Sequence, residues 1–246
     1  MTRVISVEGV NLSFPLERSV TRGVLDLLKG GDGSTKKRFK ALKDVYLDVN
    51  QGEVLGVIGR NGSGKSTLLR VMGGIYRPDS GSVKARGRTQ LLAGGSVGLN
   101  PNLTGRENVH LYGSILGHDR STMDKMMDDI LEFSEIGDFI EQPLRTYSSG
   151  MKARLGLSIA SSVEPDILLI DEVLGVGDPQ FREKSKKRIL EMVKSSGTVV
   201  LVSHSFALMS EICDRLILMH DSRIAATGEA KDVIARYYEL TGGRST

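Results

Sequence analysis

The chain has 246 residues, with 33 Lys and Arg against 30 Asp and Glu, a single Cys and no Trp. This length favours one domain, with or without a closely packed subdomain, and it allows a core that needs no metal or disulfide. Cys213 alone cannot form an internal disulfide, which is typical of reducing compartments. No apolar run approaches the roughly 18 residues of a membrane span, and Glu8 interrupts the N-terminus before a signal-peptide core can form. We therefore expect neither a secreted disulfide scaffold nor a membrane-spanning protein.

The net charge of +3 is unevenly distributed along the chain. Residues 17–43 hold eight basic and three acidic side chains, whereas the rest of the chain carries 25 basic against 27 acidic ones. A basic segment on a near-neutral body is typical of a contact with an acidic partner, anionic lipid or nucleic acid. It is equally typical of a solvated loop.

The N-terminal part of the chain predicts β-structure. Residues 3–14 alternate apolar and polar side chains as an edge strand does, and residues 42–49 alternate in the same way. Between them, residues 17–40 contain a short helix-like piece and a glycine-rich turn, so we interpret this segment as an insertion. Residues 50–52 predict a hairpin turn into residues 54–58, a continuous apolar run typical of a strand buried on both faces.

The rest of the chain alternates between helical and strand patterns. Apolar residues recur at helical spacing over residues 121–136, after a Ser/Thr cap. The later predicted elements are buried strands at 167–170 and 198–202, a charged helix at 180–196 between them, a hairpin over 215–226 that turns at Asp221 and Ser222, and a closing helix at 230–240. This order indicates an α/β fold built on a parallel sheet.

The strongest chemical signal directly follows the buried run at 54–58. It matches G-x-x-x-x-G-K-[ST], precedes a helical run that begins at Thr67, and reads Gly59-Arg60-Asn61-Gly62-Ser63-Gly64-Lys65-Ser66. Glycines let such a loop wrap around a phosphate with its N–H groups pointing inward, and the following helix adds the positive end of its dipole. We predict that Lys65 pairs with the β- and γ-phosphates and that Ser66 binds Mg²⁺.

A second signal is the pair of carboxylates that ends the buried strand at 167–170. Asp171 would lie beside the phosphate loop and hold Mg²⁺, directly or through water. Glu172, one residue further on, is suited to polarise the water that attacks the γ-phosphate.

A third signal precedes Asp171 by about twenty residues and reads Tyr147-Ser148-Ser149-Gly150-Met151. A Ser-Ser-Gly sequence at the start of a helix offers a hydroxyl, free N–H groups and a helix N-terminus, all suited to phosphate. Taken alone, the same pattern is an ordinary helix cap.

The order of these motifs, with His204 closing the next strand, resembles an ABC-type nucleotide-binding domain over most of the chain. The resemblance implies a P-loop NTPase (RecA-like) parallel sheet, an N-terminal antiparallel β subdomain and a helical signature subdomain. The catalytic core with its β subdomain would then comprise residues 1–92 and 163–246, and the coupling loop and helical subdomain residues 93–162.

The resemblance also implies roles for single residues. Glu172 would be the catalytic base, His204 a switch residue at the γ-phosphate, and Asp178 part of a loop at a dimer interface. Residues 147–151 of one subunit would bind the ATP held by the phosphate loop and Thr67 of the other, so two copies would enclose two ATP molecules. The cofactors implied are ATP and Mg²⁺.

Four segments narrow the resemblance to the ATPase subunits of polysaccharide exporters of the O-antigen, capsule and teichoic acid type. These segments are residues 59–62, 103–108, 147–151 and 171–178. The implied protein is an ATP-hydrolysing translocase subunit, a homodimer that works beneath a membrane permease at the cytoplasmic face of the cell membrane. We expect the complex, rather than this chain, to handle the lipid-linked glycan, and we expect no nucleic acid partner.

Two positions depart from the family pattern. The glutamine expected before Pro101 would fall at residues 94–96, which are Gly, Gly and Ser, and Gln90 lies five residues earlier. The aromatic residue that stacks on adenine is either Phe14 or Phe39, because the basic insertion separates the two.

Two other classes of function compete with the exporter interpretation. A soluble ABC ATPase that acts on a ribosome or DNA usually carries two tandem nucleotide domains or a long coiled coil, and this sequence shows neither. A small-molecule P-loop kinase would need neither the signature helix nor His204.

Overall fold

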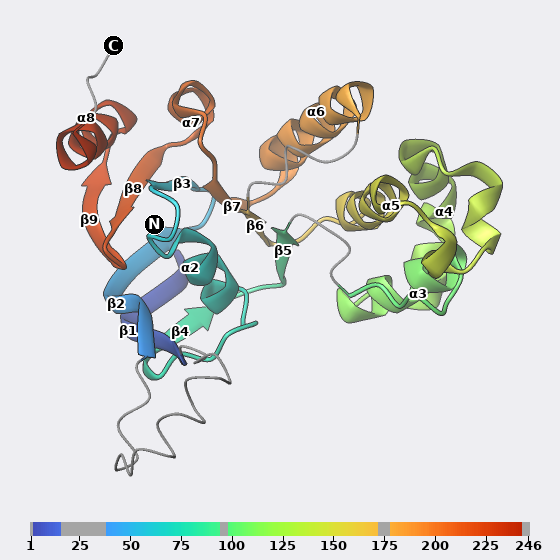
Figure 1. The fold of residues 1–246 in the computed structure, drawn as a ribbon, viewed down its shortest axis with the longest axis horizontal. Helices are drawn as coiled ribbons and strands as arrows, with labels where there is room; N and C mark the ends of the chain where they lie inside the picture. The colour runs from blue at the N-terminus through green and yellow to red at the C-terminus, as the bar shows by residue number, and fades with distance from the viewer. Residues whose placement is uncertain (1, 16–37, 94–97, 172–177, 243–246) are drawn as a thin grey trace, which may run out of the picture.

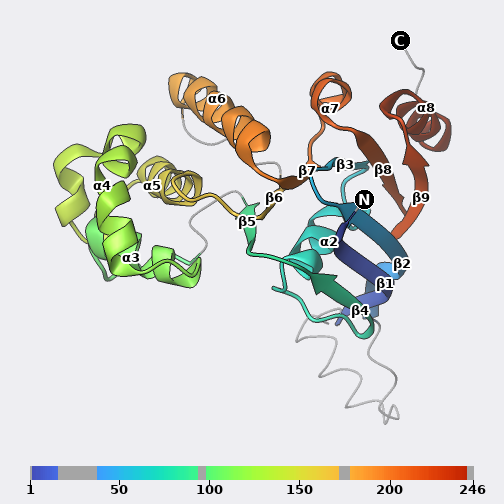
Figure 2. The ribbon, with the colours of Figure 1, turned by 180° about the vertical axis from the view of Figure 1, so that it is seen from behind.

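The computed structural model describes residues 2–15, 38–93, 98–171 and 178–242. Within these residues the chain forms two β-sheets, helices that cover them, and a separate group of helices at one end of the molecule (Figures 1 and 2). Three predicted features lie outside the described residues. They are most of the insertion (residues 17–37), the expected glutamine (residues 94–96) and Glu172. In the described ranges no helix is both long and apolar enough to cross a membrane.

The smaller sheet is antiparallel, with the order β2-β1-β4. Its strands are β1 (Arg3–Pro15), β2 (Arg38–Asn50) and β4 (Ser80–Ala85). The alternating pattern predicted the two long strands, because one face of each is buried against the core. β2 begins four residues earlier than predicted, so residues 38–40, which we assigned to the insertion, belong to this strand and pair with β1. The hairpin turn predicted at residues 50–52 is wrong, since β2 pairs with β1 and the chain passes from this turn into the other sheet.

The larger sheet has the order β5-β6-β7-β3-β8-β9. Its strands are β3 (Val54–Gly59), β5 (Thr89–Ala93), β6 (Ile167–Asp171), β7 (Thr198–Val202), β8 (Arg215–His220) and β9 (Arg223–Gly228). All neighbouring pairs are parallel except β8 and β9. Every residue of β7 is buried, and each such aliphatic side chain contributes about 1.5–3 kcal/mol. The fold class is therefore confirmed.

The β8–β9 hairpin turns where the sequence predicts, at Asp221 and Ser222, which have φ of 47° and 68°. Positive φ at both central residues is what a tight two-residue hairpin turn requires. The Ser222 hydroxyl donates to the carbonyl oxygen of Lys40 at 2.8 Å, and the Lys43 N–H donates to that of Ser222 at 2.8 Å. These bonds hold the start of β2 against the hairpin.

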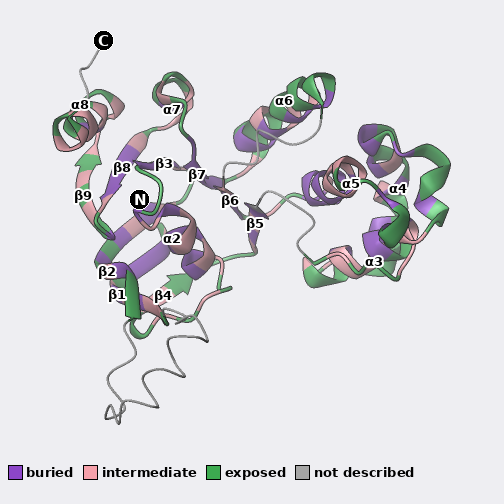
Figure 3. Ribbon diagram, in the orientation of Figure 1, coloured by how far each residue is buried: buried purple, intermediate pink, exposed green. Residues whose placement is uncertain are grey.

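Helices cover both faces of the larger sheet (Figure 3). They are α2 (Lys65–Met72), α6 (Pro179–Ser195), α7 (Phe206–Ile212) and α8 (Ala230–Thr241). One core lies between the two sheets and includes the apolar face of α2. The other face of the sheet packs against α6, α7 and α8.

The remaining helices have a core of their own, beyond the β5 edge in both views of the ribbon. They are α3 (Gly105–Ile115), α4 (Arg120–Ser134) and α5 (Ser149–Ser161), with short 3₁₀ turns η1 (Gly137–Glu141) and η2 (Leu144–Thr146). The helix predicted at 121–136 is confirmed as α4, but its cap is Asp119, whose carboxylate accepts from the Thr122 N–H at 2.8 Å. The division of the chain near residues 93 and 162 stays a prediction.

Candidate functional site

Residues 59–66 form the phosphate loop, which joins the end of β3 to the start of α2. Gly62 and Gly64 have φ of 79° and 105°, a left-handed region that favours glycine. A Cβ atom on Gly64 would lie 2.5 Å from the carbonyl oxygen of Ala41, so β2 leaves no room for a side chain. No side chain caps the N-terminus of α2, so its first N–H groups are left to bind an anion.

Lys65 lies inside this loop, with only 7% of its surface exposed. Its ammonium group donates to the carbonyl oxygens of Gly59 at 2.7 Å and Arg60 at 3.0 Å. The buried hydroxyl of Ser63 has no hydrogen-bond partner among the residues that the structure describes. Because buried polar groups are costly without partners, a buried cation beside an orphaned hydroxyl fits an anionic ligand such as phosphate.

Asp171, at the end of β6, lies against the first turn of α2. The Ser66 hydroxyl donates to Asp171 Oδ1 at 2.8 Å, and Arg70 lies 3.4 Å from Oδ2. Mg²⁺ commonly takes one or two protein oxygens and completes its shell with phosphate and water, so this pair fits a nucleotide-bound Mg²⁺. The described residues contain no group of three His, Cys, Asp or Glu that would hold a metal by itself.

His204 lies at the same edge of the sheet as the phosphate loop. Val202 of β7 is in register with Asp171 on one side and with Val57 on the other. His204 follows Val202 by two residues and is exposed, and the phosphate loop begins two residues after Val57. The parallel register thus brings Lys65, Asp171 and His204 to one edge, while Glu172 lies outside the described residues.

Two adjoining cavities of about 660 and 380 Å³ open beside the phosphate loop. Phe39, Asn61 and Gly62 line both, and Lys65, Ser66 and Thr67 line the smaller one. The larger cavity is also lined by Arg60 of the loop itself and by basic side chains that the sequence did not associate with the loop, namely Arg38, Lys40, Lys43 and His220.

The basic residues at the start of β2 therefore lie beside the phosphate loop. The excess of positive charge over residues 17–43 was the signal, which we interpreted as a contact with a partner or with solvent. These basic side chains reach the cavity because hydrogen bonds hold the start of β2 against the β8–β9 turn. The sequence does not reveal those bonds. Residues 17–37 lie outside the described residues, and their role stays a prediction.

The structure distinguishes the two aromatic candidates for adenine stacking. They are register partners on the paired strands β1 and β2. Phe39 is 48% exposed and lines both cavities. Phe14 is packed against the core, with its ring edge-on to Tyr76 at 5.4 Å between centroids. Of the two, only Phe39 presents its ring beside the loop.

The Ser-Ser-Gly motif forms the N-terminus of α5, as the sequence predicts. Ser148 is the cap, and its hydroxyl accepts from the Met151 N–H at 3.2 Å. A cavity of about 710 Å³ opens at this end of the helix and is lined by residues 148–151 together with Glu135, Arg154 and Asp178. None of the residues described around this cavity also lines the cavities at the phosphate loop. One chain thus keeps the two predicted phosphate-binding motifs apart.

Tyr147, predicted together with this motif, has a side chain that is turned into the helical core. It is only 4% exposed, and its hydroxyl donates to the carbonyl oxygen of Phe139. Burial, with a smaller effect from Glu141, raises the pKa of Tyr147 to about 12. Its side chain therefore supports the segment before α5, and only its backbone adjoins the motif.

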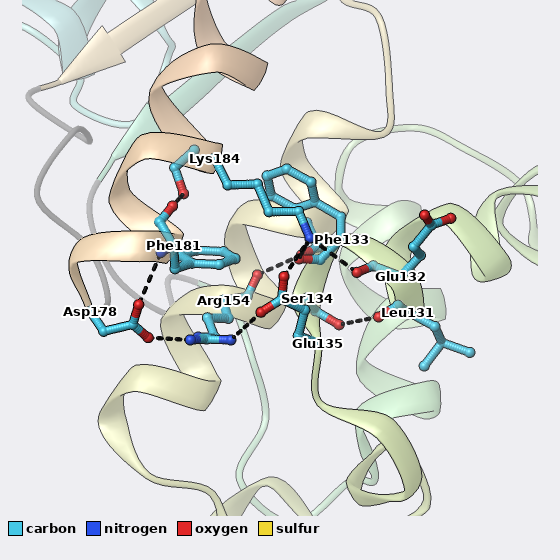
Figure 4. A network of polar contacts seen from close by, with 11 residues as sticks. Leu131, Glu132, Phe133, Ser134, Glu135, Arg154, Asp178, Phe181 and Lys184 are labelled. Carbon is cyan, nitrogen blue, oxygen red and sulfur yellow. Dashed lines mark hydrogen bonds and ion pairs between the residues drawn. The ribbon is translucent and has the colours of Figure 1, made fainter.

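Asp178 caps α6, and its Oδ1 accepts from the Phe181 N–H at 3.0 Å. Its other oxygen accepts from Arg154 of α5 (Figure 4). The bond from the Phe181 N–H, followed by the bond from Arg154, lowers the pKa of Asp178 below its usual value. Asp178 is thus held in its charged form at the junction of α5 and α6.

Gln90, the glutamine nearest to the expected position, has a buried side chain. It is 4% exposed, and its amide donates to the carbonyl oxygen of Ala160 at 2.6 Å. It connects β5 to α5 inside the molecule, and the positions expected for the glutamine, residues 94–96, lie outside the described residues.

Comparison with known proteins gives a consistent set of relatives. The family described as ABC transporter matches residues 42–175. The O-antigen export system ATP-binding protein RfbB of Klebsiella pneumoniae is 40% identical, over 96% of this chain and 98% of its own length. The teichoic acids export ATP-binding protein TagH of Levilactobacillus brevis is 45% identical, over 96% of this chain and 65% of its own length.

Solved structures agree in fold. The ATP-binding subunit of an ABC transporter superposes with a TM-score of 0.71 at 23% identity, over 98% of this chain and 95% of that one. A dimeric post-hydrolysis state of an ATP-binding cassette bound to ADP and phosphate gives a TM-score of 0.69 at 21% identity, over 92% of this chain and 98% of that one. At these identities the likeness concerns the fold alone.

Proposed function

Because the chain belongs to the ABC transporter family, as one of its ATP-binding proteins, we propose that it hydrolyses ATP to drive a membrane permease that exports a lipid-linked polysaccharide. The arrangement of Lys65, Ser66 and Asp171 around an open helix N-terminus carries the ATPase part of this proposal. The export part is supported by relatives named for O-antigen and teichoic acid export.

Binding of ATP follows from the charges of the site. The ammonium group of Lys65 and the N–H groups at the start of α2 would take the β- and γ-phosphates, and the orphaned Ser63 hydroxyl would gain a partner. Mg²⁺, held by Ser66 and Asp171, would neutralise charge that builds up on the phosphates. Basic side chains at the start of β2 would add attraction for the triphosphate, and Phe39 would stack on the adenine.

Hydrolysis would require a second copy of the chain. The motif at the N-terminus of α5 and the phosphate loop line separate cavities, so the motif of one subunit would complete the site of another. A relative in fold was solved as a dimer with ADP and phosphate, which supports this arrangement. In the closed dimer Glu172 would polarise the attacking water, and His204 would contact the γ-phosphate from the same sheet edge.

Coupling to the permease would pass through the segment before α3. Asn108, fully buried, accepts from the Asn100 N–H at 2.7 Å and donates to the carbonyl oxygens of Leu103 and Thr104. The carbonyl oxygen of Leu103 in turn accepts from the Leu144 N–H at 2.8 Å, just ahead of Ser148. A displacement of residues 100–104 by a permease would therefore reach the segment before the α5 motif through these hydrogen bonds. The chain would lie peripherally at the cytoplasmic face of the cell membrane.

The test is a pull-down of tagged Glu172→Gln protein from detergent-solubilised native membranes in the presence of ATP. This variant is expected to bind ATP, to stay closed as a dimer and to retain its partners, because the step that reopens it is blocked. A multi-span membrane protein with lipid-linked glycan in the eluate is the expected result. Lys65→Ala, which should not bind ATP, serves as the matched control.

A different eluate would change the proposal. Ribosomal components or DNA would favour the rival function, a soluble ABC ATPase. Recovery of the self-dimer alone would leave the ATPase in place and remove the transporter from the proposal.

A further inference from the structure

Glu135 ends α4 in a backbone conformation that glycine normally occupies. It is the C-cap of α4, with φ of 55°. At the equivalent position of α8 the chain uses glycine, Gly242, with φ of 70°. A left-handed residue with a side chain is strained, and such strain persists where the surrounding contacts offset it. The contacts of the Glu135 carboxylate therefore indicate what this residue is for.

The carboxylate of Glu135 connects α4 to two other helices (Figure 4). Its Oε2 accepts from Arg154 of α5 at 3.0 Å, and its Oε1 accepts from Lys184 of α6 at 2.7 Å. Lys184 also donates to the carbonyl oxygens of Glu132 and Phe133 in the last turn of α4, both at 3.2 Å. One side chain thus joins the end of α4 to both α5 and α6.

Arg154 extends this network to Asp178 at the start of α6. Its second amino group binds Asp178, which caps α6 directly after residues 172–177. Its guanidinium lies 4.7 Å above the centre of the Phe181 ring, so it is held from one face as well. Arg154 also lies one helical turn after Gly150, so its position and that of the α5 N-terminus are linked.

The same side chains set the charge of the cavity at the α5 N-terminus. Glu135 and Asp178 both line it, and two carboxylates would repel an incoming triphosphate. Arg154 and Lys184 neutralise them, because Arg154 contacts both carboxylates and Lys184 contacts Glu135. The hydrogen bond from Lys184 is the main reason that the pKa of Glu135 is lowered, so its carboxylate stays charged and bound.

We propose that Glu135 is a positioning residue, whose carboxylate fixes Arg154 and Lys184 so that the N-terminus of α5 is held where the ATP of a second copy can reach it. The inference rests on the proposed function, in which residues 148–151 bind the γ-phosphate of the partner's ATP. It assigns no contact with nucleotide to Glu135 itself. Loss of the carboxylate is expected to weaken the contact between subunits and to leave ATP binding at the chain's own phosphate loop unchanged.

The experiment compares Glu135→Asn with Glu135→Asp in the Glu172→Gln protein. Asn and Asp have the same size and both tolerate the left-handed backbone, so the two variants differ in whether the side chain ends in a charged, accepting carboxylate or in a neutral amide. The long Arg154 and Lys184 side chains can follow a carboxylate moved by one methylene. We expect Glu135→Asn to weaken ATP-dependent dimerisation, measured by sedimentation, by at least about fivefold relative to Glu135→Asp. Melting temperature and the ATP affinity of the monomer should match in the two variants.

Glu132→Gln is the control, because its carbonyl oxygen takes part in the network while its carboxylate points away (Figure 4). This variant should dimerise like the parent protein. Equal dimerisation of Glu135→Asn and Glu135→Asp would overturn the positioning role and leave the proposed function intact. A parent protein that binds ATP but does not dimerise would overturn the proposed function, and this inference with it.

Discussion

Sterics and hydrogen bonds arrange the single residues around the phosphate loop. Gly64 has no side chain because β2 passes within contact distance, and Lys65 is kept inside the loop by two carbonyl oxygens. Which of Phe14 and Phe39 stacks on adenine cannot be decided from residue type, because both are aromatic residues on paired strands. Only their surroundings separate them, and these place Phe39 beside the loop.

We therefore predict that Phe39→Ala weakens ATP binding by about tenfold, because aromatic–base stacking is worth about 1–3 kcal/mol. Calorimetric titration with ATP measures this directly. Phe39→Tyr should bind ATP as the unmodified protein does, because it keeps the ring.

Phe14→Ala should have the opposite profile. It removes the edge contact with Tyr76, worth about 0.5–1.5 kcal/mol beyond the apolar burial that is also lost, so it should lower the free energy of unfolding by at least this amount, with ATP affinity unchanged. A loss of ATP affinity in Phe14→Ala, and not in Phe39→Ala, would reverse the assignment.

At the scale of elements, α7 and α8 support the strand end that carries His204. Phe206 begins α7 two residues after His204, and its ring packs edge-on against Tyr237 and Tyr238 of α8, with centroids 5.1 and 5.7 Å apart. The helix is short, so most of its stability must come from this packing rather than from its own hydrogen bonds. The C-terminal helix thus stabilises a segment close to the predicted switch residue.

We predict that Phe206→Ala lowers the free energy of unfolding by at least about 1–3 kcal/mol, since it removes two aromatic pairs in addition to apolar burial. Urea unfolding followed by circular dichroism measures this change. Tyr46→Ala, at a side chain that is 64% exposed, should change stability by less than about 0.5 kcal/mol. Equal effects of the two substitutions would show that α8 does not support α7.

At the scale of the whole molecule, the two phosphate-binding motifs lie in different parts of one chain. The phosphate loop lies at the carboxyl end of β3, within the larger sheet. The α5 motif belongs to the helical group beyond β5 (Figure 1). In a symmetric dimer the same two surfaces meet twice, so each ATP site would combine the loop of one subunit with the motif of the other.

This arrangement predicts complementation between two inactive variants. Lys65→Ala damages the loop, and Ser149→Arg fills the start of α5. In a mixed dimer both defects fall in one site and the other site is intact. An equal mixture should recover about a quarter of the unmodified ATPase rate, since half of the dimers are mixed and each has one working site. A mixture as inactive as its components would argue for sites contained within single chains.

The sequence by itself determined those features that depend on neighbouring residues. The buried strands, α4, α6 and the β8–β9 turn follow from local apolar periods and turn residues, and the phosphate loop from glycines at fixed spacing before Lys65. The parallel fold class followed from the order of these elements. The Ser/Thr cap predicted for α4 was wrong because Asp119, one residue before the helix, competes equally well for the free N–H groups.

Only the tertiary structure decided the features that depend on residues far apart in the chain. The turn at residues 50–52 leads from one sheet to another because β2 finds its partner in β1, which no local signal records. The burial of Tyr147, the position of Phe39 and the contacts of Glu135 with α5 and α6 likewise arise where separate elements pack. Local patterns report how a segment folds, whereas the free energy of packing decides which segments meet.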